Sequence, residues 1–255
     1  MVESVIEFYD GLAEDYHLIF HDWDTAISRQ SEALSKMIRS KLVEPLKEVS
    51  ILDCSCGIGT QAIGLAKKGF KVTATDLSPV SVARAQKEAE SFGVALLFGV
   101  ADFRSLEKEI PGVFDVVLSA DNAIPHLLTD EDLALAARNL YAKLNNGGVL
   151  LLTIRNYDEL VKEKQKATVP HVFDEGRRIV FQVWDWEKDT LVYTTNHFIM
   201  QKIGGEWTTK QSKTKYRAIL REELNRCLSA VGFVDIEWHM PTESGFYQPI
   251  VTARK

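Results

Sequence analysis

Residues 51–60 read Ile51-Leu52-Asp53-Cys54-Ser55-Cys56-Gly57-Ile58-Gly59-Thr60. Apolar residues lead into a turn of small residues, which predicts a strand that passes directly into a helix. Glycine has no Cβ, so at Gly57 and Gly59 the chain can turn sharply and let a ligand approach the main chain. Asp76 ends a second apolar run 17 residues after Gly59. A carboxylate there can accept both hydroxyl hydrogens of a ribose, so the pattern predicts a nucleoside-type ligand.

Around this turn, predicted strands and helices alternate. The strands expected in this part of the chain cover residues 49–54, 71–75, 95–99, 114–119 and 149–154. The first, fourth and fifth are nearly continuous apolar runs, which is typical of a parallel sheet covered by helices on both faces. Two further strands are expected near the end of the chain, at residues 234–240 and 246–253.

The segments before and after this α/β region have a different spacing of apolar residues. Residues 1–46 repeat apolar side chains every three to four positions, which predicts helices. Residues 178–186, 190–201 and 207–220 alternate like longer strands with turn residues between them, which predicts an antiparallel sheet. We therefore expect one domain over residues 1–255. It has helices at 1–46, a core formed by 47–156 and 221–255, and an inserted sheet at 157–220.

Composition narrows the class of protein. The chain has 255 residues, with 30 Lys and Arg against 36 Asp and Glu, a net charge of −6, which argues against a nucleic-acid binder. No stretch reaches the roughly 18 apolar residues of a membrane span, and the first residues lack a signal-peptide pattern. Three cysteines without framework spacing fit a reducing compartment, so we expect a cytoplasmic protein. Cys54 and Cys56 have no second Cys or His cluster nearby, so no metal site is predicted.

The turn resembles motif one of the class I S-adenosylmethionine-dependent methyltransferases, usually Asp/Glu-x-Gly-x-Gly-x-Gly. This chain has Ser55 at the first glycine, a small residue that suits the turn. Further landmarks of that family follow in order over roughly residues 45 to 255. They are Asp76, Ala101-Asp102-Phe103, Phe114-Asp115-Val116-Val117, Leu144-Asn145-Asn146-Gly147-Gly148 and the segment from Arg221 to Phe233. The resemblance implies a Rossmann-like sheet of seven mostly parallel strands with helices on both faces, and S-adenosylmethionine as the cofactor.

The resemblance also implies which residues hold the cofactor. They lie at or after the ends of the first four strands and are Asp53, Ser55, Cys56, Gly57, Gly59, Thr60, Gln61, Asp76, Leu77, Ala101, Asp102, Phe103, Ser119 and His126. Asp76 would bind the ribose hydroxyls. The Asp102 carboxylate would accept from the adenine amino group, while the Phe103 backbone N–H would donate to the ring. His126 would contact cofactor or substrate, or only hold its loop.

The N-terminal segment resembles a lid over this cofactor. Its aromatic rings at Tyr9, Tyr16 and Trp23 would cover the ligand, and Arg29 would pair with the methionyl carboxylate. Aromatic faces stabilise a cation such as a sulfonium by roughly 0.5–2 kcal/mol. The alternative is that the aromatic side chains form the buried face of a helix, which the seven-residue spacing of Tyr9 and Tyr16 suits equally well.

Two segments are similar to the glycine and sarcosine N-methyltransferases. They are Arg155-Asn156-Tyr157-Asp158 after the fifth strand and Asn122 with His126 after the fourth. The similarity implies that Arg155 clamps a substrate carboxylate, a task that suits a planar guanidinium. Asn122 would orient the substrate amine with its side-chain carbonyl, and Tyr216 would line the substrate site. The alternatives are a structural ion pair of Arg155 with Asp158 or Glu159, and a turn role for Asn122.

Together these features predict direct in-line methyl transfer to a small molecule, with S-adenosylhomocysteine as the second product. The acceptor atom is expected to be a nitrogen, in an amine, an amino acid such as glycine or sarcosine, or a heterocycle. An O-methyltransferase of a small aromatic acceptor is an alternative, and so is a non-catalytic S-adenosylmethionine-binding regulatory protein. A homo-oligomer is left open. We expect neither nucleic acid nor membrane as a partner.

Overall fold

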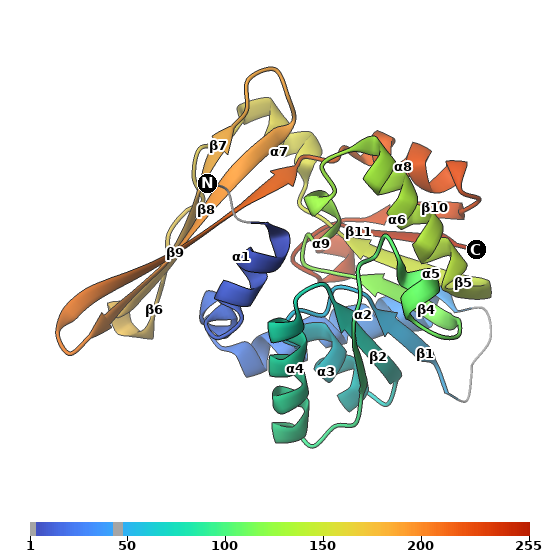
Figure 1. The fold of residues 1–255 in the computed structure, drawn as a ribbon, viewed down its shortest axis with the longest axis horizontal. Coiled ribbons are helices and arrows are strands. Elements are labelled where there is room, and N and C mark those ends of the chain that lie inside the picture. Colours follow the sequence, from blue (N-terminus) through green and yellow to red (C-terminus); the bar gives the residue numbers. More distant parts are fainter. Residues whose placement is uncertain (1–3, 43–47) are drawn as a thin grey trace.

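A seven-stranded sheet forms the centre of the molecule (Figure 1). The computed structural model describes residues 4–42 and 48–255. The strands are β1 (Ser50–Asp53), β2 (Lys71–Asp76), β3 (Leu97–Val100), β4 (Phe114–Ser119), β5 (Leu144–Thr153), β10 (Val234–His239) and β11 (Ile250–Arg254). Their order is β10-β11-β5-β4-β1-β2-β3, and only β11 runs antiparallel to its neighbours. The predicted mostly parallel sheet is confirmed.

Helices cover both faces of this sheet because alternate strand residues point to opposite sides. In β1, Ile51 packs in one apolar cluster and Leu52 in the other, and both are fully buried. One face carries α2 (Trp23–Lys41), α3 (Thr60–Lys67) and α4 (Pro79–Ser91). The other carries α5 (Leu106–Glu109), α6 (Asp130–Ala142) and α8 (Arg221–Ala230). As a result, ligand-binding side chains can lie only along the strand ends.

Several element boundaries differ from the prediction. β5 begins at Leu144 and not at the predicted residue 149, because Leu144 pairs with Phe114 and the Gly147 N–H donates to the Lys255 carbonyl at 3.1 Å. Three short α-helices, α5, α7 (Tyr157–Glu163) and α9 (Pro241–Ser244), were not predicted. Each is too short to show helical periodicity in the sequence.

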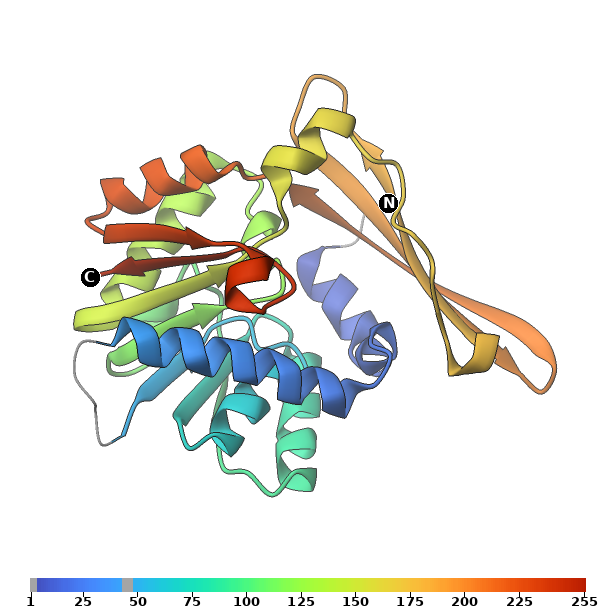
Figure 2. The same ribbon diagram turned by 180° about the vertical axis from the view of Figure 1, so that it is seen from behind.

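A separate antiparallel sheet follows β5, as predicted. Its strands lie in the order β6 (His171–Phe173), β7 (Arg178–Trp186), β8 (Val192–Ile203) and β9 (Glu206–Arg217), and η3 (Asp174–Gly176) joins the first two. Figure 2 shows the far end of this second sheet projecting away from the seven-stranded sheet. The short β6 was not predicted.

The N-terminal segment lies between the two sheets in both views (Figures 1 and 2). It comprises α1 (Val5–Leu12) and the short helix η1 (Tyr16–Ile19), which we call the lid segment. Phe8 and Leu12 pack on Val180 and Ile199 of the second sheet. The predicted boundary between lid and core, at residues 46 and 47, lies outside the described residues.

An arginine joins the lid segment to the second sheet. Arg178, at the start of β7, donates to the backbone carbonyls of Leu18, Phe20 (2.8 Å) and His21 (3.2 Å). Asp174 accepts from the same guanidinium at 2.8 Å and balances its charge. Arg178 is 5% exposed, so this is a buried, fully paired cation.

No helix in the described part of the chain is long and apolar enough to cross a membrane.

Candidate active site

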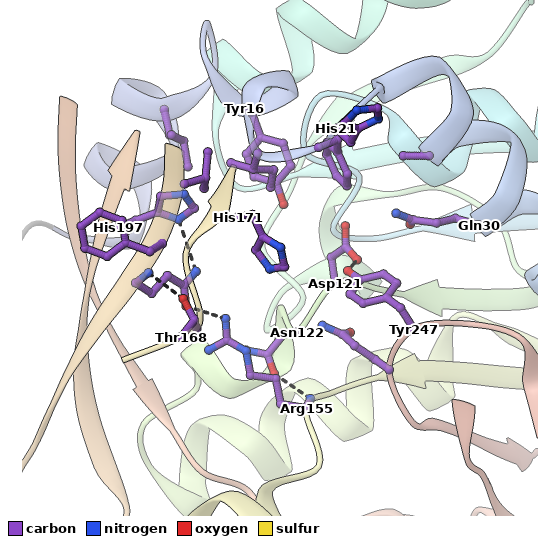
Figure 3. Close-up of a pocket in the computed structure, with 18 of the residues that line it drawn as sticks. Tyr16, His21, Gln30, Asp121, Asn122, Arg155, Thr168, His171, His197 and Tyr247 are labelled. Carbon is purple, nitrogen blue, oxygen red and sulfur yellow. Dashed lines mark hydrogen bonds between the residues drawn. The ribbon is translucent and has the colours of Figure 1, made fainter. Parts of the chain in front are cut away.

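Two adjoining cavities open where the parallel strands end. The first, about 330 Å³, is lined by the loops after β1 to β4 and by the start of the lid segment, and we call it the edge cavity. The second, about 520 Å³, lies between the lid segment, the second sheet and the loop after α9, and we call it the intersheet cavity (Figure 3). Tyr9, Tyr16 and Asp121 line both, so they mark the boundary between the two.

The wall of the edge cavity at β1 and β2 is held by a carboxylate. Asp76 Oδ2 accepts from the Gly57 N–H at 2.8 Å, and Oδ1 accepts from the Ser78 N–H at 2.9 Å. Gly57 has a φ of +52°, and a Cβ added there would meet nothing within 4 Å. The conformation, together with access to the main chain, accounts for glycine at this position. This loop therefore presents its backbone to the cavity, which fits a nucleoside ligand.

Behind this loop lies a second carboxyl group. Asp53 is fully buried, Oδ1 accepts from the Ser55 N–H at 3.3 Å, and Oδ2 has no hydrogen-bond partner among the described residues. Burial raises the pKa of Asp53 to about 8. At neutral pH the Asp53 carboxyl is therefore mainly protonated, which lowers the cost of leaving one of its oxygens without a partner.

The segment after β3 closes the opposite side of the edge cavity. Ala101, Asp102 and Phe103 line it together with Arg104, which sequence reasoning missed. The guanidinium of Arg104 pairs with the Asp102 carboxylate at 2.6 Å. The Asp102 carboxylate predicted to accept from an adenine amino group is thus already held by an arginine. Arg104 donates its backbone N–H and two guanidinium nitrogens to the two Asp102 oxygens, so a bond from an adenine amino group would have to share or displace one of these donors.

A tyrosine and a histidine connect the lid segment to the loop after β4. The Tyr9 hydroxyl lies 2.9 Å from His126 Nε2, and His126 Nδ1 lies 3.1 Å from the Lys215 carbonyl oxygen. A carbonyl can only accept, so the ring proton is on Nδ1 and Tyr9 donates to Nε2. Burial lowers the pKa of His126 to about 3, so the ring is neutral at physiological pH. His126 also packs on Tyr216, with ring centres 4.2 Å apart.

The predicted cofactor residues divide into three groups. Those that line the edge cavity are Tyr9, Tyr16, Ser55, Gly57, Asp76, Leu77, Ala101, Asp102, Phe103 and His126. Arg29 lines the intersheet cavity instead. Those on neither wall are Trp23, Asp53, Cys56, Gly59, Thr60, Gln61 and Ser119. Trp23 is the clearest departure, because its indole N–H donates to Thr60 at 2.9 Å and its ring packs on Phe92.

The buried residues off the wall hold the loops in place. Ser119 and Ser55 share a hydrogen bond of 2.9 Å between their hydroxyls. Gly59 has a φ of +97°, and a Cβ there would lie 2.8 Å from Ile63 Cδ1. Gln61 donates to Asp121 Oδ2 at 2.9 Å. Motif one thus supplies packing and turn geometry more than ligand contacts.

Arg155 projects into the intersheet cavity from the end of β5 (Figure 3). Its Nη1 donates to the Tyr193 hydroxyl and its Nη2 to Gln182 Oε1, both at 2.8 Å. The guanidinium carbon lies 4.9 Å from the ring centre of Trp184 and 5.5 Å from that of Tyr216. Neutral and aromatic groups therefore surround the cation.

The ion-pair alternative for Arg155 is wrong. Asp158 lies 3.5 Å from Arg221, and Glu159 pairs with Lys162 at 2.9 Å. Within the described ranges, no carboxylate forms a salt bridge with Arg155. A cation in a cavity without a counter-charge favours an anionic ligand.

Asp121 and Asn122, directly after β4, both adopt left-handed backbone conformations, with φ of +58° and +65°. Such values are uncommon outside glycine, and backbone outliers gather at functional sites. The Asp121 carboxylate accepts from Gln61 and from the Tyr247 hydroxyl. Burial raises the pKa of Asp121 to about 6, and no described cationic side chain pairs with it.

The Asn122 side chain is used differently from the prediction. Its Oδ1 accepts from the Arg155 backbone N–H at 3.0 Å, which fixes the orientation of the amide. Its Nδ2 is buried and has no partner among the described residues. The atom left for a ligand is therefore a donor, whereas the sequence predicted a carbonyl acceptor.

Several residues of the intersheet cavity were not predicted. They are Asp121, Gln182, Thr195, His197 and the 245–248 loop. Asp121 directly precedes the predicted Asn122, and its position after a parallel strand was the available signal. The residues of the second sheet give no such signal, since polar side chains alternate along all of its strands.

Comparisons with known proteins agree with this arrangement. Residues 51–148 match the methyltransferase domain family. The chain is 35% identical over 164 residues to a glycine/sarcosine N-methyltransferase of Parasynechococcus marenigrum, covering 63% of this chain and 57% of that protein. It is 25% identical to a glycine/sarcosine N-methyltransferase of Aphanothece halophytica over 95% of this chain and 85% of that protein.

The chain thus spans little more than half the length of the first relative. Among solved structures, the SAM-bound amino pentose methyltransferase CalS10 of Micromonospora echinaspora superposes with a TM-score of 0.68. It is 20% identical, with coverage of 89% of this chain and 92% of that one. That likeness shows the fold. From the sequence match, the fold and the edge cavity, we conclude that the chain carries a class I S-adenosylmethionine-dependent methyltransferase domain, with S-adenosylmethionine as its cofactor.

Proposed function

We propose that this protein transfers a methyl group from S-adenosylmethionine to the nitrogen of a small molecule that also carries an anionic group. The observation that carries this proposal is the pair of unmatched charges in the intersheet cavity. Arg155 has no carboxylate partner and Asp121 has no cationic partner among the described residues. A zwitterion such as an amino acid would complement both.

The residues of the edge cavity fit the cofactor. Asp76 is held by two backbone N–H groups, and Gly57 leaves the main chain open to the cavity. When bound, S-adenosylmethionine supplies an activated methyl group on a sulfonium. The task of the chain is then to align the acceptor and exclude water.

The position of Asp121 favours nitrogen over oxygen as the acceptor atom. Its carboxylate borders both cavities, so it can stabilise positive charge on either side of the boundary. Methylation of a neutral amine leaves the positive charge on the nitrogen. Attack by a phenolate would instead place a second anion next to Asp121, which is repulsive.

Tyr9 and Tyr16 lie at the same boundary and come from the lid segment. The hydrogen bond from Tyr9 to His126 fixes α1 against the loop after β4. Closing this segment over both ligands would exclude water from the reacting atoms. A neutral His126 suits this role, because a protonated Nε2 could no longer accept from Tyr9.

The relatives support the same class of acceptor. Two are named glycine/sarcosine N-methyltransferases, and a structural neighbour is named an amino pentose methyltransferase. All three names are consistent with small acceptors, and the first two with an amine next to a carboxylate. We therefore place small amino acids ahead of sugars and heterocycles as acceptors for this chain.

The test is methyl transfer by the purified full chain to a panel of amino acids, simple amines, amino sugars and phenols, with formation of S-adenosylhomocysteine as the readout. We expect amino acids to exceed the amines that lack a carboxylate. A preference for phenols would contradict the proposal. Cofactor binding without turnover on the whole panel would instead support the regulatory, non-catalytic alternative.

A further inference from the structure

The face of the second sheet that borders the intersheet cavity carries a polar band. Gln182 on β7 lies opposite His197 on β8, and Trp184 lies opposite Thr195. Thr195 in turn pairs with Thr214 on β9. On one side of this band lies Tyr193, and on the other the lid segment packs on apolar side chains of the sheet. The band is thus enclosed by apolar neighbours and screened from solvent.

Several atoms of this band are buried without a partner. Thr195 Oγ1 and His197 Nε2 have no hydrogen-bond partner within the described ranges, and their side chains are 1% and 7% exposed. Both residues line the intersheet cavity, as does Asn122, whose Nδ2 is also unpartnered. Buried polar groups in proteins are nearly always hydrogen-bonded. Unpartnered atoms gathered on one cavity wall therefore point to a polar ligand.

The hydrogen bonds also determine which atom of His197 is a donor. Gln182 Oε1 accepts from Arg155 at 2.8 Å and from the Trp184 indole at 3.0 Å, so this atom is the carbonyl oxygen. Gln182 Nε2 is then the NH₂ group, and it lies 3.3 Å from His197 Nδ1. Nδ1 must accept, which places the ring proton on Nε2. Burial lowers the pKa of His197 to about 4, so the ring stays neutral.

Arg155 is always charged and donates to Gln182 Oε1, which fixes the orientation of the Gln182 amide. That orientation in turn leaves His197 Nε2 as an N–H donor without a partner among the described residues. One glutamine side chain joins the two, so a ligand can reach both the guanidinium and the imidazole. Figure 3 shows His197 and Arg155 linked through these hydrogen bonds on one side of the cavity. Donors outnumber acceptors on this wall.

We propose that the methyl acceptor carries a second hydrogen-bond-accepting group in addition to its anionic group, and that His197 Nε2 and Thr195 Oγ1 bind it. This inference rests on the proposed function and names the substrate class more narrowly, as an amino acid with a polar side chain. Glycine and sarcosine, which have no such group, would leave both atoms unpaired. A cavity of about 520 Å³ is in the range that encloses ligands much larger than glycine.

A first test compares two acceptors of similar length, glutamine and norleucine, in the wild-type chain and in His197→Phe. We expect the wild type to favour glutamine by about tenfold or more in kcat/KM, since the apolar side chain leaves buried donors unpaired. In His197→Phe that ratio should fall below about threefold, with norleucine turnover retained. His197→Gln, which keeps an N–H donor, should restore part of the ratio.

His239→Phe is the matched control, because it makes the same change at a partly buried histidine that lines neither cavity. The selectivity ratio should not change in this variant. Equal turnover of both acceptors by the wild type, or an unchanged preference in His197→Phe, would overturn the inference.

A second test does not depend on turnover. Nitrogen-15 NMR of the imidazole groups should show the His197 proton on Nε2, and glutarate, with two carboxylates, should shift this signal while butyrate does not. In Gln182→Glu a carboxylate oxygen would face Nδ1, so the proton should be found there. A proton on Nδ1 in the wild type, or no response to glutarate, contradicts the inference. If glutarate shifts the His197 signal but no acceptor is methylated, the proposed methyl transfer is wrong while the binding role of His197 stands.

Discussion

The edge cavity and the intersheet cavity meet at Asp121, yet they are built in opposite ways. The edge cavity is made by loops that each follow a parallel strand and by the start of the lid segment, and Asp76 holds the main chain of the loop after β1. The intersheet cavity is made by side chains from the lid segment, the second sheet and the loop after α9. One wall depends on backbone geometry, and the other on the identity of single side chains.

This difference separates two tasks. A backbone wall tolerates many side chains and suits a ligand that is the same throughout a family. A wall of side chains can change its charge and hydrogen-bonding groups without disturbing the strands, which suits a ligand that varies. Substitutions in the two cavities should therefore affect different ligands, and measuring both affinities for each variant tests that division.

The largest effect is expected for Arg155→Ala. Loss of the only guanidinium proposed to bind the acceptor's anion should lower kcat/KM for the acceptor by about 100-fold or more, as for other truncated charge pairs. Cofactor affinity should change less than about threefold, because Arg155 lines only the intersheet cavity. Isothermal titration with the cofactor and steady-state kinetics provide the two numbers. Equal losses in acceptor kcat/KM and in cofactor affinity would contradict the proposal that Arg155 binds the acceptor's anionic group.

Asp121→Asn tests the boundary itself. The variant should lose about 10-fold to 100-fold in kcat, since a neutral amide cannot balance the positive charge at the reacting atoms. Burial raises the pKa of Asp121 from 3.8 to about 6. In the wild type the carboxylate becomes charged as pH rises through about 6, and kcat should rise with it. In Asp121→Asn the rise of kcat near pH 6 should be absent, while any rise caused by deprotonation of the acceptor amine remains.

Asp121→Asn should lower kcat but raise the thermal stability of the fold at neutral pH. A carboxyl whose folded pKa is raised binds its proton more tightly in the folded state, so its charged form at neutral pH destabilises the fold. Asp121→Asn should therefore raise Tm at pH 7.5 and have less effect at pH 4. Asp115→Asn is the matched control, because its folded pKa is lowered and the sign should reverse. A lower Tm for Asp121→Asn would show that its hydrogen bonds outweigh its desolvation.

Asp76→Ala is the counterpart of Arg155→Ala in the edge cavity. It removes the proposed ribose acceptor and the group that holds the Gly57 and Ser78 N–H groups. We expect cofactor Kd to rise about 10-fold to 100-fold, since two charge-assisted hydrogen bonds are lost. The acceptor KM, measured at saturating cofactor, should stay within about threefold. A large rise in acceptor KM would show that the two cavities are coupled.

The smallest effect is expected for Tyr9→Phe, which removes the hydrogen bond between the lid segment and His126. The pKa of His126 falls to about 3 in the folded chain, against 6.5 for an unperturbed histidine. Between these values the unfolded chain binds more protons, so His126 makes stability fall as pH decreases from 6.5 towards 3. Tyr9→Phe should shift Tm only slightly at pH 7, by the value of about one hydrogen bond. Protonation of His126 should also release α1 from the loop after β4, so the backbone amides of α1 should be less protected from hydrogen exchange at pH 5 than at pH 7. Identical protection factors at the two pH values would contradict this expectation.

The sequence was sufficient for the part of the fold that depends on apolar periodicity. The strands β1 and β4 and residues 149–153 of β5 are nearly continuous apolar runs, and Gly57 and Asp76 mark the turns that follow β1 and β2. These features follow from local chemistry, so the seven-stranded sheet could be predicted, together with the strand ends at which the edge cavity lies. The second sheet was also predicted, because strand alternation and turn residues are local signals.

The side chains of the intersheet cavity could not be predicted in the same way. Gln182 and His197 meet because of the register between β7 and β8, and the sequence does not determine which residues face one another. The role expected for the Asn122 carbonyl stays a prediction, and the sequence did not show that Arg155 donates its backbone N–H to this oxygen. Trp23 was assigned to the ligand, yet it packs on Phe92, a partner that only the fold brings near.

Arg178 has a consequence for exchanging parts between relatives. Its guanidinium is shared by Asp174 and by carbonyls of the segment at residues 18–21. A chimera that receives a foreign second sheet but keeps this N-terminal segment would leave these carbonyls without their donor. The two pieces should therefore be grafted as one module, although more than 150 residues separate them in the chain.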